Sequence, residues 1–290
     1  MIIAFLGIGL MGLPMASNLL KAGFKVNVYN RTLAKTNPLA TLNAQVFSTS
    51  TQAIVDADVI ITMLDSETAQ EQVLVNPKVL AQCKPNCLII DMASISPRAA
   101  KKHAKLAKEF QINYIDAPVS GGTLGAERAQ LVIMAGGSDE DLITAQPIFD
   151  ALGSKTVHIG PIGAGQITKC ANQSVVGITI GAVSEALLLA NQAGLDTKKV
   201  REALMGGFAA SKVLDQHGIR MIEKNFTPGG TAKVQLKDLN NTIAVANDYQ
   251  LKLPFTQLAN EQFQLLNDNG QHNLDHSALL LLLEQNNKIN

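Results

Sequence analysis

Short apolar runs of strand length recur through the first half of the chain and alternate with segments of helical spacing. The strand-length runs are Ile2–Leu6, Lys25–Tyr29, Val59–Leu64, Leu88–Met92, Tyr114–Ile115, Leu131–Ala135 and Val157–Ile159. Between them, segments such as Met15–Ala22 and Pro97–Phe110 carry apolar residues at helical intervals. Strands that alternate with helices indicate right-handed crossovers and a mainly parallel sheet, so the first half is predicted to be an α/β domain.

The pattern changes near residue 160, where the glycine-rich break Gly160–Gly165 ends the strand-like runs. The next segment, Gln166 to about Ala193, is rich in Ala, Ile, Val and Leu and predicts one helix of roughly 40 Å. Further helical patterns follow at Thr197–Met205, Ala209–Lys224, Thr231–Asp248, Leu253–Leu266 and His276–Gln285. We therefore predict an α/β domain over residues 1–162 and an all-helical domain over residues 163–290.

The composition agrees with a globular chain and argues against several other classes of protein. The 290 residues suffice for two domains of ordinary size. Lys plus Arg and Asp plus Glu are 24 each, and a formal net charge of zero argues against a general nucleic-acid binder. The chain has no run of about 18 uninterrupted apolar residues, so the sequence predicts no membrane-spanning helix. The first residues, Met1–Phe5, lack the basic start of a signal peptide and predict a first strand.

The three cysteines, Cys83, Cys87 and Cys170, are too few and too unevenly spaced for a disulfide framework. They also lack the second pair that a structural metal site needs, so we expect no metal. A reducing compartment, by default the cytoplasm, is therefore the expected location.

A glycine-rich turn directly follows the first predicted strand, with the sequence Gly7-Ile8-Gly9-Leu10-Met11-Gly12. Gly7 allows a tight turn, Gly9 lets the backbone approach a pyrophosphate, and Gly12 lets the next helix pack closely on the strand. The helix N-terminus then offers N–H groups and a partial positive charge to the phosphates. Because the motif lies between a strand and a helix, we predict dinucleotide binding rather than a purely structural turn.

The end of the second predicted strand carries Asn30, Arg31 and Thr32, and no acidic residue. An acidic side chain would accept hydrogen bonds from the ribose hydroxyls of NAD, whereas a guanidinium and a hydroxyl suit a 2′-phosphate. We therefore predict NADP, used as NADPH in reduction, with NAD as the weaker alternative. The alternative for Arg31 is an ordinary solvated arginine.

Later strand ends are expected at the same cofactor, because open α/β sheets bind ligands at the carboxyl ends of their strands. Met63 and Leu64 end the third apolar run, and Ser94 follows the fourth. Ser94 is predicted to contact the nicotinamide or its ribose. A turn or a helix cap before Pro97 accounts for the same serine equally well.

Two later segments carry polar groups suited to a small anionic substrate. Ser120 and the two glycines after it offer a hydroxyl and N–H groups that can hold a carboxylate, although such a loop is also an ordinary turn. Lys169 lies three and four positions before Asn172 and Gln173, so the three share one face of the long helix. A buried lysine there is costly without a role or a partner, but a lysine that extends to solvent fits as well.

Taken together, these segments resemble the β-hydroxyacid dehydrogenase family, which includes 3-hydroxyisobutyrate dehydrogenases and tartronate semialdehyde reductases. The resemblance covers essentially the whole chain and rests on four motifs in order: the glycine turn with Met11–Ala16, the Asp116–Gly122 loop, the Gly163–Gln173 segment and Lys237-Asp238-Leu239. It implies a Rossmann-type domain, a long interdomain helix, a helical C-terminal domain and an active site in the cleft.

The resemblance also implies residue roles. Lys169 looks like the catalytic lysine. The residues that look like the substrate-binding set are Ser120, Gly121 and Gly122 in the carboxylate loop, with Asn172 and Gln173 as the amide pair after the lysine. Lys237 and Asp238 resemble a later motif that closes over the nicotinamide and the substrate.

Within the family, the segments Lys169–Gln173, Asn225–Gly229 and Asp275–Ala278 look closest to tartronate semialdehyde reductases. The predicted activity is therefore NADPH-dependent reduction of a small carboxylate-bearing aldehyde, with tartronate semialdehyde giving glycerate. The chain departs from the family at Gly230, where relatives often carry an aromatic residue, which leaves the pocket wall and the substrate open. Glyoxylate or succinate semialdehyde reductase and 3-hydroxyisobutyrate dehydrogenase are the alternatives.

The implied mechanism gives Lys169 the task of stabilising and protonating the carbonyl oxygen as hydride arrives. The alternative from outside the enzymes is a catalytically silent NADP-binding protein, against which Lys169, Ser120 and Lys237 argue. Small residues along the long helix favour a homodimer or homotetramer. Asp275 is predicted to cap a helix, and the histidines are predicted to be exposed or internally bonded, namely His103, His158, His217 and His272.

Overall fold

The computed structural model describes residues 1–289 and divides into two compact units. Unit 1 comprises Met1–Lys169, and unit 2 begins at Cys170. Each unit has hydrophobic core residues of its own. The predicted fold class, a Rossmann-type α/β domain followed by a helical region with one long helix, is confirmed.

Unit 1 is built around a sheet of nine strands among the described residues. The strands are β1 (Ile2–Leu6), β2 (Lys25–Tyr29), β3 (Gln45–Val46), β4 (Val59–Thr62), β5 (Leu88–Asp91), β6 (Asn113–Asp116), β7 (Val119–Ser120), β8 (Leu131–Gly136) and β9 (Gly153–Gly160). Their order is β3-β2-β1-β4-β5-β6-β8-β7, and β9 pairs with β8. β8 runs antiparallel to β6 and β7, whereas the other pairs are parallel. The mainly parallel sheet is therefore confirmed.

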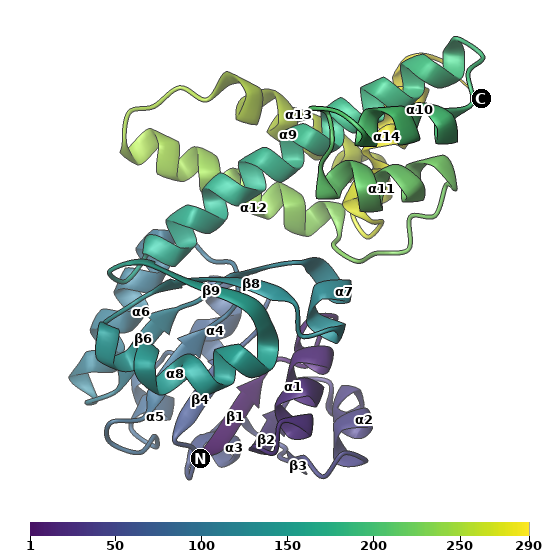
Figure 1. Ribbon diagram of the computed structural model, residues 1–290. Helices are drawn as coiled ribbons and strands as arrows, with labels where there is room; N and C mark the ends of the chain where they lie inside the picture. Colours follow the sequence, from purple (N-terminus) through teal and green to yellow (C-terminus); the bar gives the residue numbers. More distant parts are fainter. Residues whose placement is uncertain (290) are drawn as a thin grey trace. The chain divides into compact units, whose positions relative to one another are not determined.

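Helices cover both faces of this sheet (Figure 1). Because successive side chains of a strand point to opposite faces, Ile3 and Phe5 enter one core cluster while Ala4 and Leu6 enter the other. The first cluster includes residues of α1 (Gly12–Lys21), α2 (Asn37–Ala40), α7 (Gly122–Glu127) and α8 (Asp139–Leu152). The second lies against α3 (Ser50–Ile54), α4 (Glu67–Val73), α5 (Pro77–Leu80) and α6 (Pro97–Glu109).

Serine side chains start several helices of unit 1 at defined residues. Ser96 accepts a hydrogen bond from the N–H of Ala99 at 3.1 Å, and Pro97 occupies the first turn of α6. Ser138 caps α8 in the same way. The cap before Pro97 is thus Ser96, so the alternative that made Ser94 this cap is wrong.

Unit 2 is helical. Its elements are α10 (Thr197–Met205), α11 (Lys212–Ile222), α12 (Ala232–Asp248), α13 (Pro254–Leu266), the π-type turn η2 (Asn267–Gln271), the 3-10 turn η3 (His276–Ala278) and α14 (Leu279–Asn286). The predicted helix from Ala209 starts only at Lys212, because the Ser211 side chain caps it by accepting from the N–H of Leu214. The predicted helix His276–Gln285 is instead divided between η3 and α14.

The predicted long helix is α9 (Ala164–Gln192), which has 29 residues and runs without interruption from unit 1 into unit 2. Ile180, Val183 and Leu187 bury their side chains in the core of unit 2. By length and composition alone α9 could cross a membrane, a test that the core helix of a soluble protein also passes.

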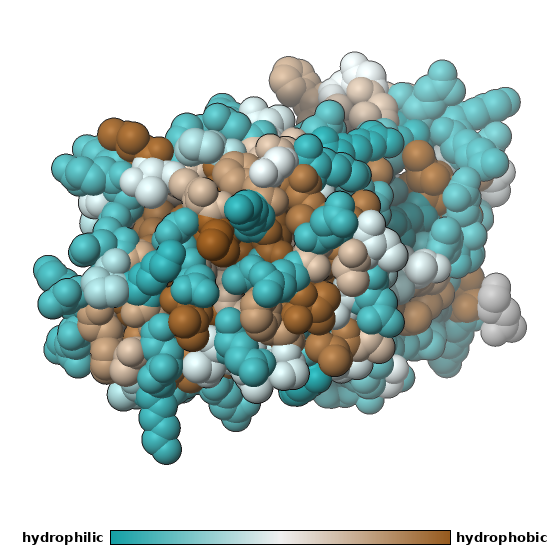
Figure 2. Space-filling view, turned by 90° about the horizontal axis from the view of Figure 1, so that it is seen from below, coloured by the Kyte–Doolittle hydropathy of each residue, from teal (hydrophilic) through white to brown (hydrophobic). Residues whose placement is uncertain are grey.

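The surface of unit 1 has an open hollow beside its edge strand β3. The hollow has a volume of about 540 Å³ and is lined by Leu33, Val46, Phe47, Ser48, Gln52, Val55 and Asp56. Because Leu33 directly follows Thr32, the hollow adjoins the loop after β2. On the face seen in Figure 2, hydrophobic side chains lie in patches separated by hydrophilic ones.

Candidate functional site

The glycine turn after β1 combines tight packing at its ends with open space at its centre. Gly7 has a φ of +107°, and a Cβ there would lie 2.3 Å from the carbonyl oxygen of Met63. A Cβ on Gly12 would lie 1.9 Å from the carbonyl oxygen of Gly7, so both positions require glycine. No atom outside the turn lies within 4 Å of a Cβ placed on Gly9. This open backbone before a helix fits the close approach of a pyrophosphate.

The turn is tied to the end of β2 through Asn30. The N–H of Ile8 donates to Asn30 Oδ1 at 2.9 Å, and Asn30 Nδ2 donates to the carbonyl oxygen of Thr32 at 2.9 Å. Arg31 and Thr32 are exposed beside this link. Asn30 thus shapes the loop, and Arg31 is the side chain of the three that offers a positive charge there.

The end of β4 also meets the glycine turn. The Leu64 side chain comes within 2.9 Å of the Cβ position of Gly7, next to the Met63 carbonyl. Leu10 is exposed, and Met11 is the half-buried residue before α1. The structure therefore brings together, at the carboxyl ends of β1, β2 and β4, the residues predicted to bind the cofactor there.

Ser94 is half-buried in the loop after β5, and this loop is held by a side chain that sequence reasoning did not single out. Gln166 Oε1 accepts from the N–H of Ile95 at 3.2 Å, and Gln166 Nε2 donates to the carbonyl oxygen of Ala93 at 2.8 Å. Gln166 is fully buried in the first turns of α9. The available signal was a long polar side chain at the start of an otherwise apolar helix.

Asp116, at the end of β6, anchors the start of α9. Its two carboxylate oxygens accept from the N–H groups of Gly163 at 2.6 Å and Gln166 at 2.8 Å, which satisfies donors of the first helical turn. Burial raises the pKa of Asp116 to about 7, against these hydrogen bonds and together with the nearby charge of Asp91. Sequence reasoning saw Asp116 only as the first residue of its loop.

Lys169 lies on the second turn of α9 beside the loop predicted to bind a carboxylate. Its Nζ donates to the carbonyl oxygen of Val119 at 2.8 Å, and Val119 directly precedes Ser120. Gly121 and Gly122 have φ angles of +139° and +61°; Gly121 precedes α7 and Gly122 is its first residue. Lys169 is half-buried, which lies between the two predicted alternatives of a buried lysine and a lysine that extends to solvent. The structure thus joins the predicted catalytic lysine to the Ser120 loop.

A second group of predicted residues meets within unit 2, between α9 and α12. Asn172 Nδ2 donates to Gln173 Oε1 at 2.8 Å, and Gln173 Nε2 donates to Asp238 Oδ2 at 2.7 Å. Lys237 Nζ lies 3.3 Å from Asp238 Oδ1. The amide pair and the Lys237–Asp238 motif are therefore parts of one network, although they lie more than 60 residues apart in the chain.

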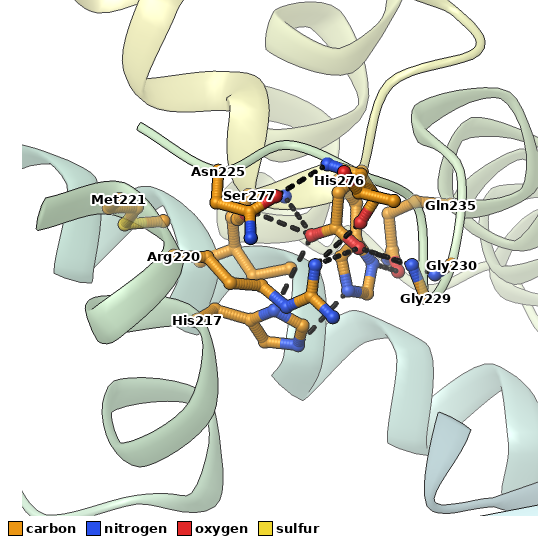
Figure 3. Close-up of polar contacts among 12 residues, drawn as sticks. His217, Arg220, Met221, Asn225, Gly229, Gly230, Gln235, His276 and Ser277 are labelled. Carbon is orange, nitrogen blue, oxygen red and sulfur yellow. Dashed lines mark hydrogen bonds and ion pairs between the residues drawn. The ribbon is translucent and has the colours of Figure 1, made fainter. Parts of the chain in front are cut away.

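Beside this network lies a polar cluster that sequence reasoning did not assemble (Figure 3). The rings of His217 and His276 are perpendicular, with centroids 4.5 Å apart. Asp275 is fully buried and caps η3 by accepting from the N–H of Ser277, as predicted. Burial opposes the ionisation of Asp275, but the hydrogen bond from His217, the charge of His276 and N–H donors hold its pKa well below the usual range. No local spacing signals this cluster, because its members come from α11 and the start of η3.

Comparisons with known proteins identify the family. Residues 2–160 match the family model described as the NAD binding domain of 6-phosphogluconate dehydrogenase. Residues 163–283 match the model described as NAD-binding of NADP-dependent 3-hydroxyisobutyrate dehydrogenase. The chain is 42% identical to 2-hydroxy-3-oxopropionate reductase of Escherichia coli (strain K12), over 97% of each chain. It is 33% identical to 3-hydroxyisobutyrate dehydrogenase of Pseudomonas aeruginosa, over 96% of this chain and 95% of that one.

A solved structure agrees with these relatives. The 3-hydroxyisobutyrate dehydrogenase of Mycobacterium tuberculosis with L-serine superposes with a TM-score of 0.87 at 30% identity, over 97% of this chain and 98% of that one. The resemblance predicted from the motifs is confirmed, and with it an oxidoreductase with hydroxyacid dehydrogenase activity and a nicotinamide cofactor. The chain therefore belongs to the 3-hydroxyisobutyrate dehydrogenase-like family.

Proposed function

We propose that the protein reduces a small carboxylate-bearing aldehyde with NADPH, and that its substrate is tartronate semialdehyde, which gives glycerate. The observation that carries this proposal is the hydrogen bond from Lys169 Nζ to the carbonyl of Val119, which holds an ammonium group beside the Ser120 loop. A loop that can bind a carboxylate, with a proton donor beside it, suits a substrate that carries both a carboxylate and an aldehyde group.

The cofactor, when bound, supplies the hydride that adds to the carbonyl carbon. Lys169 acts on the carbonyl oxygen of the substrate, where negative charge builds as hydride arrives at the carbon. Its ammonium stabilises that charge and then transfers a proton to the oxygen, which leaves a hydroxyl group. In the reverse direction the neutral amine accepts the proton, so one residue serves both directions.

The substrate carboxylate binds at Ser120, Gly121 and Gly122. The left-handed φ angles of the two glycines open a turn whose N–H groups can face an anion, and the Ser120 hydroxyl adds a further donor. Asn172 and Gln173 bind the remaining polar groups of the substrate. Their orientation is supported by the hydrogen bonds to each other and to Asp238.

The residues proposed to hold the cofactor lie at the carboxyl ends of the strands of unit 1. Gly7–Gly12 would hold its pyrophosphate, and Met63, Leu64 and Ser94 would contact its other parts. Arg31 and Thr32 would bind the 2′-phosphate, which favours NADP over NAD, and no acidic residue at this loop opposes that charge. The adjoining hollow beginning at Leu33 offers apolar surface to the adenine end. Lys237, on α12, is the remaining residue proposed to bind the cofactor.

Tartronate semialdehyde is favoured over the other aldehydes because the relative at 42% identity is a 2-hydroxy-3-oxopropionate reductase, which is another name for this activity. The 3-hydroxyisobutyrate dehydrogenase at 33% identity supports the main alternative. Gly230 stands where relatives often carry an aromatic residue in the pocket wall. A Cβ on Gly230 would lie 3.6 Å from the ring of His276, so an imidazole ring lies beside this position instead of an aromatic hydrocarbon. A polar wall favours the hydroxylated aldehyde.

We also propose that the protein is a homodimer or homotetramer in the cytoplasm, with NADP-binding over residues 1–162 and the helical part over residues 163–290. Exposed apolar side chains on α9 and α13 support assembly, among them Leu189 and Phe255 at 73% and 72% exposure. The three cysteines, all present as thiols, support a reducing compartment.

Initial rates of NADPH and NADH oxidation test this function. The aldehydes are tartronate semialdehyde, glyoxylate, succinate semialdehyde and methylmalonate semialdehyde, and Arg31→Ala is compared with the unmodified chain. We expect the highest kcat/KM for tartronate semialdehyde with NADPH, and a KM for NADPH about tenfold higher in Arg31→Ala, with little change for NADH. A higher kcat/KM for another aldehyde would make that aldehyde the substrate instead of tartronate semialdehyde. If none of the four aldehydes is reduced, the catalytically silent cofactor-binding protein is the remaining alternative.

A further inference from the structure

Two histidines of unit 2 face each other through the same ring nitrogen (Figure 3). Nε2 of His217, on α11, lies 3.1 Å from Nε2 of His276, at the start of η3. The outer nitrogens point at oxygen atoms: Nδ1 of His276 lies 3.3 Å from Gln235 Oε1, and Nδ1 of His217 lies 3.5 Å from Asp275 Oδ1. Four ring nitrogens thus form a short chain between an amide and a carboxylate.

The neighbouring hydrogen bonds determine which atom of Gln235 faces His276. Gln235 Nε2 donates to the backbone carbonyl of Gln173 at 3.1 Å, so the other end of the amide is the oxygen. Gln173 Nε2, which donates to the carboxylate of Asp238, reaches that same oxygen at 3.3 Å. Because an amide oxygen only accepts, the proton of the contact with His276 is on Nδ1 of the histidine.

The same reasoning applies to His217. Its Nδ1 is buried and faces the buried carboxylate of Asp275, where a lone pair would meet a negative charge. A proton on Nδ1 removes that conflict. With both Nδ1 atoms protonated, two neutral rings would direct two lone pairs at each other across 3.1 Å, which is the length of a hydrogen bond. One further proton between the Nε2 atoms turns this repulsion into a hydrogen bond.

A metal ion could take the place of that proton, since two imidazoles and a carboxylate are common ligands. The carboxylate is already occupied: its oxygens accept from Ser277, Gly229 and Gly230, at distances from 2.6 to 3.3 Å. Arg220 Nη1 also lies 3.8 Å from Asp275 and would repel a cation. The cluster therefore favours a proton over a metal.

We propose that His217 and His276 share one extra proton and act as positioning residues, which hold Gln235 and through it the amide pair Asn172–Gln173 in its substrate-binding orientation. The link is continuous, because Gln235 Oε1 accepts from His276 and from Gln173, which in turn accepts from Asn172. The effect on substrate binding rests on the function proposed above, whereas the protonation of the pair does not.

The charged groups around the pair set the direction of its pH dependence. Asp275 at the start of η3 favours the protonated pair and Arg220 on α11 opposes it. Lys237 and Asp238 on α12 are linked to the pair through the amides. When the proton is lost at alkaline pH, the lone pairs repel, the His276 contact with Gln235 is released and the amides lose their support. Substrate binding should therefore weaken as pH rises.

Nitrogen-15 NMR of histidine side chains in the full chain tests the proton directly. We expect Nδ1–H on both rings, and one imidazolium shared between His217 and His276 at neutral pH. His217→Asn should remove the coupled titration of His276, whereas His272→Gln, a half-buried histidine on the adjoining loop, should not change it. Two neutral rings at neutral pH, or independent titrations, would refute the pair. Binding of Co²⁺ with loss of the shared proton at stoichiometric metal would show a metal site instead.

Kinetics test the positioning role. His276→Gln should raise the KM for the aldehyde about tenfold with kcat changed less than about threefold, as for loss of a hydrogen bond to a charged group. The KM should also lose its rise at alkaline pH, while His272→Gln keeps it. A kcat effect with unchanged KM, or a retained pH profile, would overturn the positioning role. If no aldehyde is reduced, the proposed function fails, and the NMR result still decides the shared proton.

Discussion

The Lys169 side chain is oriented by a backbone group. Its ammonium donates to the carbonyl oxygen of Val119 at 2.8 Å. This hydrogen bond holds the ammonium beside the Ser120 loop, which is the position that the proposed proton transfer requires.

Replacing Lys169 separates its chemistry from cofactor binding. We expect Lys169→Ala to lower kcat by about 100- to 10,000-fold, the usual contribution of general acid catalysis, with the Kd for NADPH changed less than about twofold. Stopped-flow rates and fluorescence titration with NADPH give the two values. Lys105→Ala, at an exposed position of α6, is the matched control. An equal loss of NADPH affinity would place Lys169 in cofactor binding instead.

For single residues, a role could be predicted from the sequence where it depends on neighbours along the chain. The glycine turn was predictable because Gly12 packs on the carbonyl oxygen of Gly7 within one strand–turn–helix unit. Gln166 and Gln235 were missed because their partners lie 41 to 73 residues away in the chain. Such pairings depend on topology, and nothing in the spacing of one segment announces them.

The start of α9 depends on a buried carboxyl group. Burial raises the pKa of Asp116 to about 7 and that of Asp91 to about 6, above the ordinary value of 3.8. The folded state therefore binds more protons than the unfolded state between about pH 4 and pH 7. Their contribution to stability is present below pH 4 and is lost as pH rises through about 6 to 7.

Urea unfolding between pH 5 and pH 8 measures this contribution. We expect the component of the unfolding free energy that comes from Asp116 to fall as pH rises, and Asp116→Asn to flatten that slope. The variant should also be less stable by roughly 1 to 3 kcal/mol at each pH, because one N–H of the first turn of α9 loses its acceptor. Asp56→Asn, at an exposed carboxyl, should leave the slope unchanged. An unchanged slope in Asp116→Asn would contradict the linkage.

Several elements have the bounds that the hydrophobic pattern predicts. α10 was predicted with its observed bounds, and β1 and β2 likewise. The two-residue strands β3 and β7 escaped notice because a period of two cannot be seen in two residues. The start of α11 differed from the predicted one because the Ser211 side chain caps the helix there.

On the scale of the whole molecule, unit 2 exposes more large apolar side chains than a solitary helical domain requires. Val175 and Leu189 on α9 are 66% and 73% exposed, and Phe255 and Leu258 on α13 are 72% and 57% exposed. Contact with a second copy would remove this surface from water. The change from an α/β part to a helical part was predictable from the change of period near residue 160, whereas such surface contacts leave no periodic signal.

Light scattering at micromolar concentration tests the assembly. We expect a mass of at least twice 30.9 kDa for the unmodified chain. The double variant Phe255→Glu with Leu258→Glu should shift it toward the monomer, because buried charges at an apolar contact are costly. Ile143→Glu, at a 75% exposed position of unit 1, is the control and should keep the larger mass. A monomer for the unmodified chain would exclude the proposed oligomer.

The uninterrupted course of α9 fixes the spacing of its polar side chains. Lys169 and Gln173 lie four positions apart on this helix, or about 6 Å along its axis. Inserting or deleting one residue between them would turn the helix beyond that point by about 100° and would take Gln173 off the face that it shares with Lys169. Under the proposed function, this stretch therefore tolerates substitutions but no change of length.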